Sequence, residues 1–372
     1  MPEVRLDPWG RPDIKDYSRL YEVFGIRPFR EVAEKMKSMG IEQSLLMRRG
    51  IVFGHRDFDS LLDFYKRGEK VAVMTGFVPS GGFHFGHLLT GKQLLYFQNL
   101  GFKIFVGIAD AEAYAVRHIK RKEAIRIGVE EYIANLLAIG LDERKTEFYF
   151  QTSRKGSYHS LIQLFGSKVT SSEFESIYGE ITPGKIVSAL TQAADILHPQ
   201  LDEYGGYKMV LVPVGADQDP HLRLTRDLAE RMKGEVELRP PSSIYHRLMR
   251  GLDGGKMSSS RPETTIFLNE PLEVARKKFM SSLTGGRNTA EEQRRLGGEP
   301  EKCPVFDFYI YQLIEDDNKL NDVYKRCKGG KLLCGECKAM GFSMIREFLE
   351  GHQRKLQASR EVAWSIVETP KF

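Results

Sequence analysis

The chain has 372 residues and a mass of 42.4 kDa, which at about 100–200 residues per domain predicts two or three domains. Hydrophobic residues make up 41 % and charged residues 28 %, values that exclude a disordered, collagen-like or disulfide-scaffold protein. The net charge of +5 permits a nucleic-acid partner without requiring one. The sequence contains no run of about 18 apolar residues, so no membrane span is predicted. The polar first 20 residues lack the apolar core of a signal peptide, so we expect a cytoplasmic protein.

Residues 1–70 form a polar N-terminal extension with short amphipathic segments. Helical spacing is present at 29–40 and again at 59–70, where Gly68 ends the pattern. The segment RRGIVFGHRDF at 48–58 carries a glycine turn among apolar residues and predicts a short hairpin.

From residue 71 onward, short β-type runs alternate with helical segments. The predicted strands are 71–77, 103–110, 146–153 and 208–217, and the predicted helices are 87–101, 121–142 and 221–234. This alternation is typical of a parallel sheet covered by helices. The sequence therefore predicts an α/β, Rossmann-type nucleotide-binding domain over residues 71–265. Beyond it only helical periodicity remains, which predicts an α-helical domain over residues 266–372.

The turn after the first predicted strand, PSGGFHFGH at 79–87, combines three glycines with two histidines. It leads into a helix, and the free N–H groups at a helix N-terminus attract anions. The imidazoles of His84 and His87 can donate hydrogen bonds to phosphate oxygens as charge grows in a transition state. A structural histidine pair is the alternative interpretation.

The segment GLDGGKMSSSRPETT at 251–265 predicts a flexible, cationic loop rich in hydroxyl groups. Such a loop can fold over a triphosphate, with Lys256 as a mobile positive charge and Ser258 or Ser259 in contact with phosphate. By itself the composition is that of an ordinary surface loop. Together with the earlier histidine turn it becomes a specific pattern.

The predicted strand at 208–217 ends in Gly215-Ala216-Asp217-Gln218. In an open α/β sheet, ligands bind outside the carboxyl ends of the strands. Asp217 suits the hydroxyl groups of a ribose, and Gln218 suits a polar group of a substrate. A turn followed by a capped helix is the alternative.

A HxGH turn followed by a later KMSSS loop resembles the class I aminoacyl-tRNA synthetases. Within that class, the stretch from Lys70 to about Asp317 resembles the archaeal and eukaryotic tryptophanyl-tRNA synthetases. The segments that carry this resemblance are TGFVPSG (75–81), ADAEAYAV (109–116), TQAADIL (191–197), VGADQDPHLRLTRDLAERM (214–232), KMSSS (256–260) and TGGRNTAEEQRRLGG (284–298). The segment at 48–58 is similar to a hairpin that precedes the catalytic domain in that branch.

Three other functions compete with this interpretation. A tyrosyl-tRNA synthetase has a similar histidine turn, but that family places a substrate-binding tyrosine where Met74 stands here. A HxGH nucleotidyltransferase that adenylates a small acid would generally lack the helical C-terminal domain. A non-catalytic tRNA-binding paralogue would have no need of both intact motifs.

The resemblance implies a ligase that activates L-tryptophan with ATP and Mg²⁺, releases pyrophosphate and transfers the tryptophanyl group to the 3′ end of tRNA(Trp). It implies a homodimer whose helical domain reads the anticodon, where the basic segment 324–338 is a candidate phosphate contact. The residues it assigns to catalysis are His84, His87, Lys256 and Ser258. The residues it assigns to ATP binding are Gly76, Ser80, Gly86, Gly215, Asp217, Lys256, Met257, Ser258 and Ser259.

The indole site departs from the eukaryotic pattern. Those enzymes hold the indole N–H with a tyrosine and a glutamine, and the matching positions here are Met74 and Gly107. The segment AADIL instead resembles the bacterial pattern and nominates Asp195 as the indole acceptor, since a competitor without the N–H would leave a buried carboxylate unpaired. An ordinary helix residue is the alternative for Asp195. The residues predicted to bind the substrate ammonium are Glu112, Gln192 and Gln218.

The cysteines are concentrated in one part of the chain. All four follow residue 302, with the spacing Cys303-x23-Cys327-x6-Cys334-x2-Cys337. A C-x2-C pair with two further cysteines is a candidate four-thiolate site for zinc or an iron–sulfur cluster, and some bacterial tryptophanyl-tRNA synthetases carry a cluster with similar spacing. Disulfides and free buried thiols are the two alternatives.

Overall fold

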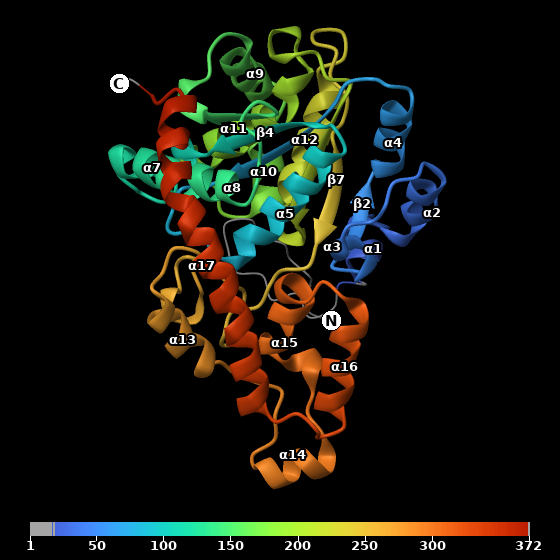
Figure 1. The fold of residues 1–372 in the computed structure, drawn as a ribbon. Helices are drawn as coiled ribbons and strands as arrows, with labels where there is room; N and C mark the ends of the chain where they lie inside the picture. Colours follow the sequence, from blue (N-terminus) through green and yellow to red (C-terminus); the bar gives the residue numbers. More distant parts are fainter. Residues whose placement is uncertain (1–16, 18, 371–372) are drawn as a thin grey trace. The chain divides into compact units, whose positions relative to one another are not determined.

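The computed structural model describes residue 17 and residues 19–370. The first 16 residues, which belong to the predicted N-terminal extension and carry the signal-peptide argument, lie outside the described residues. The chain divides into two compact units: unit 1 runs up to Ser80 and includes Thr90–Arg247 and Ser359 onward, and unit 2 comprises Gly81–Leu89 and Leu248–Ala358 (Figure 1). The functional division at residues 70 and 265 remains a prediction. No described helix is long and apolar enough to cross a membrane.

Unit 1 contains a seven-stranded sheet in the order β1-β2-β7-β6-β3-β4-β5. Strands β7, β6, β3, β4 and β5 run parallel, while β1 and β2 are antiparallel at one edge. All four predicted strands are present, so the predicted α/β class is confirmed. The bounds are β1 Arg27–Pro28, β2 Val52–Arg56, β3 Val71–Phe77, β4 Lys103–Ile108, β5 Thr146–Phe150, β6 Met209–Gly215 and β7 Ser242–His246.

The segment 48–58 does not fold as the predicted hairpin. It contributes the single strand β2, which pairs with β1 on one side and with β7 on the other. Gly54 occupies no turn: it lies inside the strand, where a Cβ atom would collide with the side chain of Ile26. The prediction was wrong because the partners of this strand are distant in the sequence, and a local glycine pattern carries no information about them.

Helices surround the sheet of unit 1, and Figure 1 shows α11 and α12 beside its strands. Helix α11 begins at an N-cap, Thr182, whose side chain accepts a hydrogen bond from the backbone N–H of Lys185. The predicted helix at 121–142 is α7 and α8 joined by a π-helical segment, Gly128–Ile133. The helices up to β7 are α1 Arg19–Phe24, α2 Arg30–Ser38, α3 Leu45–Arg48, α4 Phe58–Lys66, α5 Phe85–Asn99, α6 Asp110–Ala115, α7 Arg121–Ile127, α8 Ala134–Ala138, α9 Ser157–Gly166, α10 Ser171–Tyr178, α11 Pro183–Leu197 and α12 Asp219–Arg231.

One face of the sheet packs against α11 and α12. Because side chains alternate between the two faces of a strand, Ala72 and Met74 of β3 point to the same side. There they join one buried cluster with Tyr149 of β5, Ile196 of α11 and Leu222 of α12. This cluster places α11 across the strands whose carboxyl ends carry the candidate site residues.

The strand order produces a switch point in the sheet. Strand β3 lies between β4, the next strand in the chain, and β6, which follows much later. At such a reversal the connections leave on opposite sides, and a crevice opens at the carboxyl ends of the two strands. The candidates of unit 1 that lie at the ends of β3, β4 and β6, namely Gly76, Glu112 and Asp217, therefore belong to one edge of the sheet.

Unit 2 is mainly helical, which confirms the predicted helical C-terminal region. Its core includes Phe279 and Phe308, whose rings meet edge to face, and Gly341, where a Cβ atom would come within 2.9 Å of the Tyr309 hydroxyl. The helices of this region are α13 Leu272–Met280, α14 Ala290–Leu296, α15 Pro304–Phe308, α16 Asp317–Lys328 and α17 Cys334–Ile366, of which the last belongs to unit 1 from Ser359 onward.

The four cysteines of unit 2 are free thiols. Burial, with a smaller contribution from the neighbouring cysteines, raises the pKa of the Cys327 thiol to about 11 and that of the Cys337 thiol to about 12. Within residues 17 and 19–370, no group of three or more His, Cys, Asp or Glu side chains is arranged to hold a metal ion. The structure therefore does not support the predicted metal site at Cys303, Cys327, Cys334 and Cys337, nor the alternative of disulfides.

A buried ion pair joins the antiparallel edge of the sheet to helix α12. Asp219, the first residue of α12, has a fully buried side chain. Arg56 of β2 donates from Nε at 3.1 Å and from Nη2 at 3.0 Å, and the hydroxyl of Tyr245 donates at 2.7 Å. Without Arg56, the buried carboxylate would keep only the exposed Arg223, whose Nε lies 3.2 Å from Oδ2, as a cationic partner.

Replacement of Arg56 by alanine should lower the free energy of unfolding by about 3 kcal/mol, because Asp219 would lose its bidentate partner. Denaturant unfolding followed by circular dichroism measures the change. Arg144→Ala is the matched control: Arg144 pairs with Asp142 at the surface, and loss of an exposed pair should leave stability unchanged. Equal stability of the Arg56 and Arg144 variants would contradict the importance of the buried pair.

We expect purified protein to contain four titratable thiols and no stoichiometric zinc or iron, because the thiols are free and the described side chains form no group that could hold a metal ion. A thiol count under denaturant and metal analysis of anaerobically purified protein measure both quantities. One bound metal per chain, or fewer than four thiols without reductant, would show that the native state differs from this arrangement.

Candidate functional site

The histidine turn of unit 2 is held by hydrogen bonds within itself. Nδ1 of His84 accepts from the backbone N–H groups of Gly86 at 3.1 Å and His87 at 3.3 Å, and Nδ1 of His87 accepts from the N–H of His84 at 3.3 Å. The two rings stack with centroids 3.7 Å apart. The turn therefore holds both rings in fixed orientations.

Both histidines are neutral at neutral pH. Burial is the main reason that the pKa of His84 lies well below its usual value, and burial together with nearby Lys256 lowers the pKa of His87 to about 3. A neutral imidazole whose Nδ1 accepts a hydrogen bond carries its proton on Nε2. Each ring thus presents a neutral N–H donor, which suits a phosphate oxygen.

The loop that carries Lys256 (residues 251–265, the lysine loop) contacts the histidine turn (residues 81–87) within unit 2. A Cβ atom on Gly81 would lie 2.9 Å from Cβ of Ser259, and one on Gly86 would lie 2.9 Å from the His84 ring and 3.7 Å from Sδ of Met257. These contacts leave no room for a side chain at either glycine. The two sequence motifs, distant along the chain, therefore form one surface.

Backbone and hydroxyl hydrogen bonds shape the lysine loop. The N–H of Met257 donates to the carbonyl of Met249 at 3.0 Å, and the hydroxyl of Thr265 donates to the carbonyl of Ser258 at 2.9 Å. The hydroxyls of Ser258 and Ser260 lie 3.0 Å apart. The loop is therefore anchored directly after Lys256, at Met257 and Ser258, and the hydroxyls of Ser258 and Ser260 lie close together.

Several predicted ATP-binding residues lie in unit 1, at the carboxyl ends of its strands. Gly76 is exposed within β3, although its strand neighbours on both sides are buried. Ser80 is exposed just beyond that strand. Gly215 ends β6, and Asp217 follows it as a buried carboxylate that accepts a hydrogen bond from Nε2 of Gln218 at 3.2 Å. The exposed backbone of Gly76 is where a planar ligand group can approach the sheet.

Two of the four tryptophan candidates, Gln192 and Asp195, lie on one face of α11, which they share with Ser188. Ser188, Gln192 and Asp195 follow at i, i+4 and i+7, so they share a face of the helix. The hydroxyl of Ser188 donates to Oε2 of Glu112 at 2.8 Å, and both groups are buried. Gln192 is half-buried between these two ends. The structure therefore brings three of the four tryptophan candidates together in unit 1, while Gln218 contacts Asp217.

Asp195 is the centre of a buried hydrogen-bond cluster that the sequence did not indicate. Its Oδ1 accepts from the hydroxyls of Tyr149 and Tyr158, each at 2.8 Å, and its Oδ2 accepts from Nε2 of Gln151 at 2.6 Å. Burial raises its pKa to about 6, although the three donors oppose that shift. Tyr149 and Gln151 stand in the predicted strand 146–153, where polar groups in an otherwise apolar run were the available signal.

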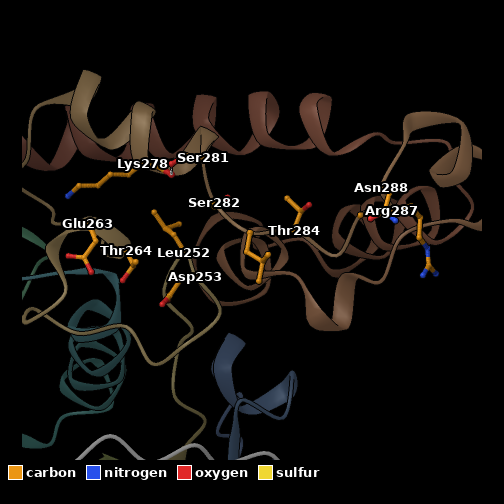
Figure 2. Close-up of a pocket in the computed structure, with 12 residues that line it drawn as sticks. Leu252, Asp253, Glu263, Thr264, Lys278, Ser281, Ser282, Thr284, Arg287 and Asn288 are labelled. Carbon is orange, nitrogen blue, oxygen red and sulfur yellow. Dashed lines mark hydrogen bonds between the residues drawn. The ribbon is translucent and has the colours of Figure 1, made fainter.

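A polar hollow of about 610 Å³ opens elsewhere in unit 2, and Figure 2 shows its lining. Asp253 and Thr264 belong to the loop that carries Lys256, and Lys278 and Ser282 come from α13 and the turn after it. The charge of Lys278 is offset by Glu270, and its ammonium donates to the carbonyl of Thr265 at 3.0 Å. None of the predicted site residues lines this hollow.

Comparisons with known proteins show the family to which the chain belongs. The family model described as tRNA synthetases class I (W and Y) matches residues 66–350. The tryptophan–tRNA ligase of Aeropyrum pernix is 62 % identical over 372 residues, all of both chains, and that of Hyperthermus butylicus is 54 % identical over 373 residues, again with both chains fully covered.

Solved structures of tryptophanyl-tRNA synthetases also resemble this chain. The crystal structure of the Aeropyrum pernix tryptophanyl-tRNA synthetase superposes with a TM-score of 0.94 at 62 % identity and covers 99 % of this chain and 100 % of that one. The Plasmodium falciparum tryptophanyl-tRNA synthetase superposes with a TM-score of 0.85 at 27 % identity and covers 95 % and 98 %. With its histidine turn and lysine loop in contact, the chain belongs to the class I aminoacyl-tRNA synthetases, in their tryptophanyl branch.

Proposed function

We propose that this chain activates L-tryptophan with ATP and transfers it to tRNA(Trp), as a tryptophan–tRNA ligase of the cytoplasm. The observation that carries the proposal is the contact between the turn at His84 and His87 and the loop at Lys256. That contact places two neutral N–H donors beside one cation, an arrangement suited to a polyphosphate. The full-length similarity to the Aeropyrum pernix tryptophan–tRNA ligase supports the choice of amino acid.

In the first step the tryptophan carboxylate attacks the α-phosphorus of ATP, and the bond to the leaving pyrophosphate breaks. His84 and His87 donate from Nε2 to phosphate oxygens, and Lys256 with Ser258 and Ser259 stabilises the charge that moves to pyrophosphate. No protein side chain forms a covalent bond, so catalysis rests on positioning and electrostatics. Mg²⁺ that accompanies ATP would supply further neutralisation of the phosphate charge, and we assign it no protein ligand.

The nucleoside part of ATP is assigned to residues at the carboxyl ends of the strands. Asp217 accepts from the ribose hydroxyls, and the exposed glycine in β3, Gly76, gives the base a flat surface. Gly86 permits close approach, because a side chain there would occupy the space beside His84. The remaining proposed contacts are Ser80, Gly215 and Met257.

Tryptophan is assigned to the polar face of α11. Glu112, oriented by Ser188, binds the ammonium group together with Gln192 and Gln218. We assign the indole ring to the other end of this face, beside Asp195 and its hydrogen-bonded cluster. Seven residues separate Ser188 from Asp195, which at 1.5 Å per residue is about 10 Å along the helix. That length accommodates the tryptophan molecule from its ammonium group to its ring nitrogen.

Transfer to the 3′-terminal adenosine of tRNA completes the reaction, and we assign anticodon recognition to residues 266–372. Within the basic segment 324–338, Lys338 donates to the carbonyls of Met280 at 2.8 Å and Ser282 at 2.7 Å, and Lys328 forms an ion pair with Glu301. These two lysines are therefore engaged within the protein. The exposed side chains that we assign to RNA phosphates are Lys325, Arg326 and Lys331. We propose a homodimer by analogy with the family.

Amino-acid-dependent exchange of pyrophosphate into ATP tests the proposed function. We expect exchange with tryptophan, and none with tyrosine or without an amino acid, because Met74 is buried in the apolar cluster where the tyrosine enzymes need a phenol-binding side chain. Exchange with tyrosine alone would refute the specificity. Exchange that needs neither amino acid would favour a different adenylating enzyme.

Lys256→Ala should slow tryptophan-dependent exchange by about 10²–10³, because one preorganised charge on the leaving pyrophosphate is lost. Lys277→Ala is the matched control, since Lys277 is exposed on α13 in the same unit, and its exchange rate should equal that of the unmodified protein. Similar rates for both variants would remove Lys256 from the proposed catalytic set.

A further inference from the structure

We propose that Oε1 of Gln151 accepts the hydrogen bond from the indole N–H of tryptophan, and that Asp195 acts through Gln151 as a positioning residue. The inference rests on the proposed activation of tryptophan and deepens it, because it names the group that reads the indole ring. It differs from direct recognition by Asp195, which the bacterial-type segment AADIL favours.

The first observation is an unpaired acceptor in a buried place. Gln151 follows β5 directly and is 4 % exposed. Its Oε1 has no hydrogen-bond partner among the described residues. Buried carbonyl oxygens are almost always paired, and an unpaired one carries a desolvation cost. A ligand that brings an N–H donor into this place would remove that cost.

The second observation fixes the orientation of the amide. Nε2 of Gln151 lies 2.6 Å from Oδ2 of Asp195. An ionised carboxylate can only accept hydrogen bonds, so the amide must turn its NH₂ group toward Asp195 and its carbonyl oxygen away. Asp195 thereby holds Oε1 in the orientation of an acceptor.

The third observation concerns the carboxylate itself. Asp195 already receives three donors, from Gln151, Tyr149 and Tyr158. The hydroxyl proton of each tyrosine points to this carboxylate. A further donor gains less from a carboxylate with three partners than from an amide oxygen with none. Among the described groups of this cluster, the glutamine oxygen is the acceptor that lacks a partner.

The position agrees with the proposed substrate orientation. Gln151 stands at the carboxyl end of β5, the edge of an open α/β sheet where ligands bind. It contacts Asp195 at one end of the polar face of α11, whereas Glu112 contacts Ser188 at the other end. An amino acid that lies along this face with its ammonium at Glu112 brings its ring nitrogen to the Gln151 end.

The test compares tryptophan with an analogue in which sulfur replaces the ring N–H, 3-(3-benzothienyl)alanine, in pyrophosphate exchange. The unmodified protein should prefer tryptophan in kcat/KM by about 10² or more, because the analogue leaves the buried acceptor unpaired. Gln151→Met retains a side chain of similar length without the acceptor. Its kcat/KM for tryptophan should fall by about 10²-fold, mainly through KM, while that for the analogue changes by less than about threefold.

Two variants serve as controls for the cluster. Tyr158→Phe removes another donor to Asp195 and leaves Gln151 in place, so the ratio between tryptophan and the analogue should persist. Asp195→Ala removes the anchor of the amide, and that ratio should shrink. Thermal unfolding measures the stability of each variant. A variant that is merely less stable should lose activity equally with both substrates.

Equal losses for tryptophan and the analogue in Gln151→Met would overturn the assignment, and so would unchanged kinetics with tryptophan. If Tyr149→Phe were the only variant to abolish the preference for tryptophan over the analogue, the indole N–H would be recognised by the Tyr149 hydroxyl. That result would also overturn the assignment to Gln151. An unmodified protein with no tryptophan-dependent exchange would refute the proposed function itself, whatever the effect of the substitutions at Gln151.

Discussion

The parallel order of five strands is the constraint on which the proposed chemistry of unit 1 depends. Because β7, β6, β3, β4 and β5 run the same way, their carboxyl ends meet at one edge. Residues from four distant segments can then face one ligand: Gly76 near the end of β3, Glu112 after β4, Gln151 after β5 and Asp217 after β6. The strand order reverses between β3 and β6, and in open α/β sheets ligands bind at such a switch point.

Buried carboxylates connect this sheet to its helices, and each is accompanied by donors. Asp219 binds Arg56 and Tyr245, which joins α12 to strands β2 and β7. Asp195 binds two tyrosines and a glutamine, which joins α11 to β5 and α9. An isolated buried charge would be expensive, so each cluster is specific in geometry. The first cluster has a stabilising role, and the second orients the groups assigned to the substrate.

Local sequence patterns were sufficient to predict the helices and strands in which apolar residues recur at regular spacing. The apolar runs at 71–77 and 208–217 correspond to β3 and β6, and the helical spacing beyond residue 265 corresponds to α13–α17. The strand at 242–246 and the true partners of 52–56 were missed, because strand pairing joins residues far apart in sequence. The cysteine spacing suggested a metal site, but spacing alone does not fix how the thiols are arranged in space, and the described side chains form no group that could hold a metal ion.

The sequence by itself determined the α/β class, the helical C-terminal region, the turn with His84 and His87 and the loop with Lys256, because each depends on neighbouring residues and their periodicity. Only the tertiary structure decided that the turn and the loop touch, that both histidines are neutral, and that Asp195 already has three donors while Oε1 of Gln151 has none among the described residues. Burial and hydrogen bonding arise from segments distant in the chain, and no local pattern encodes them.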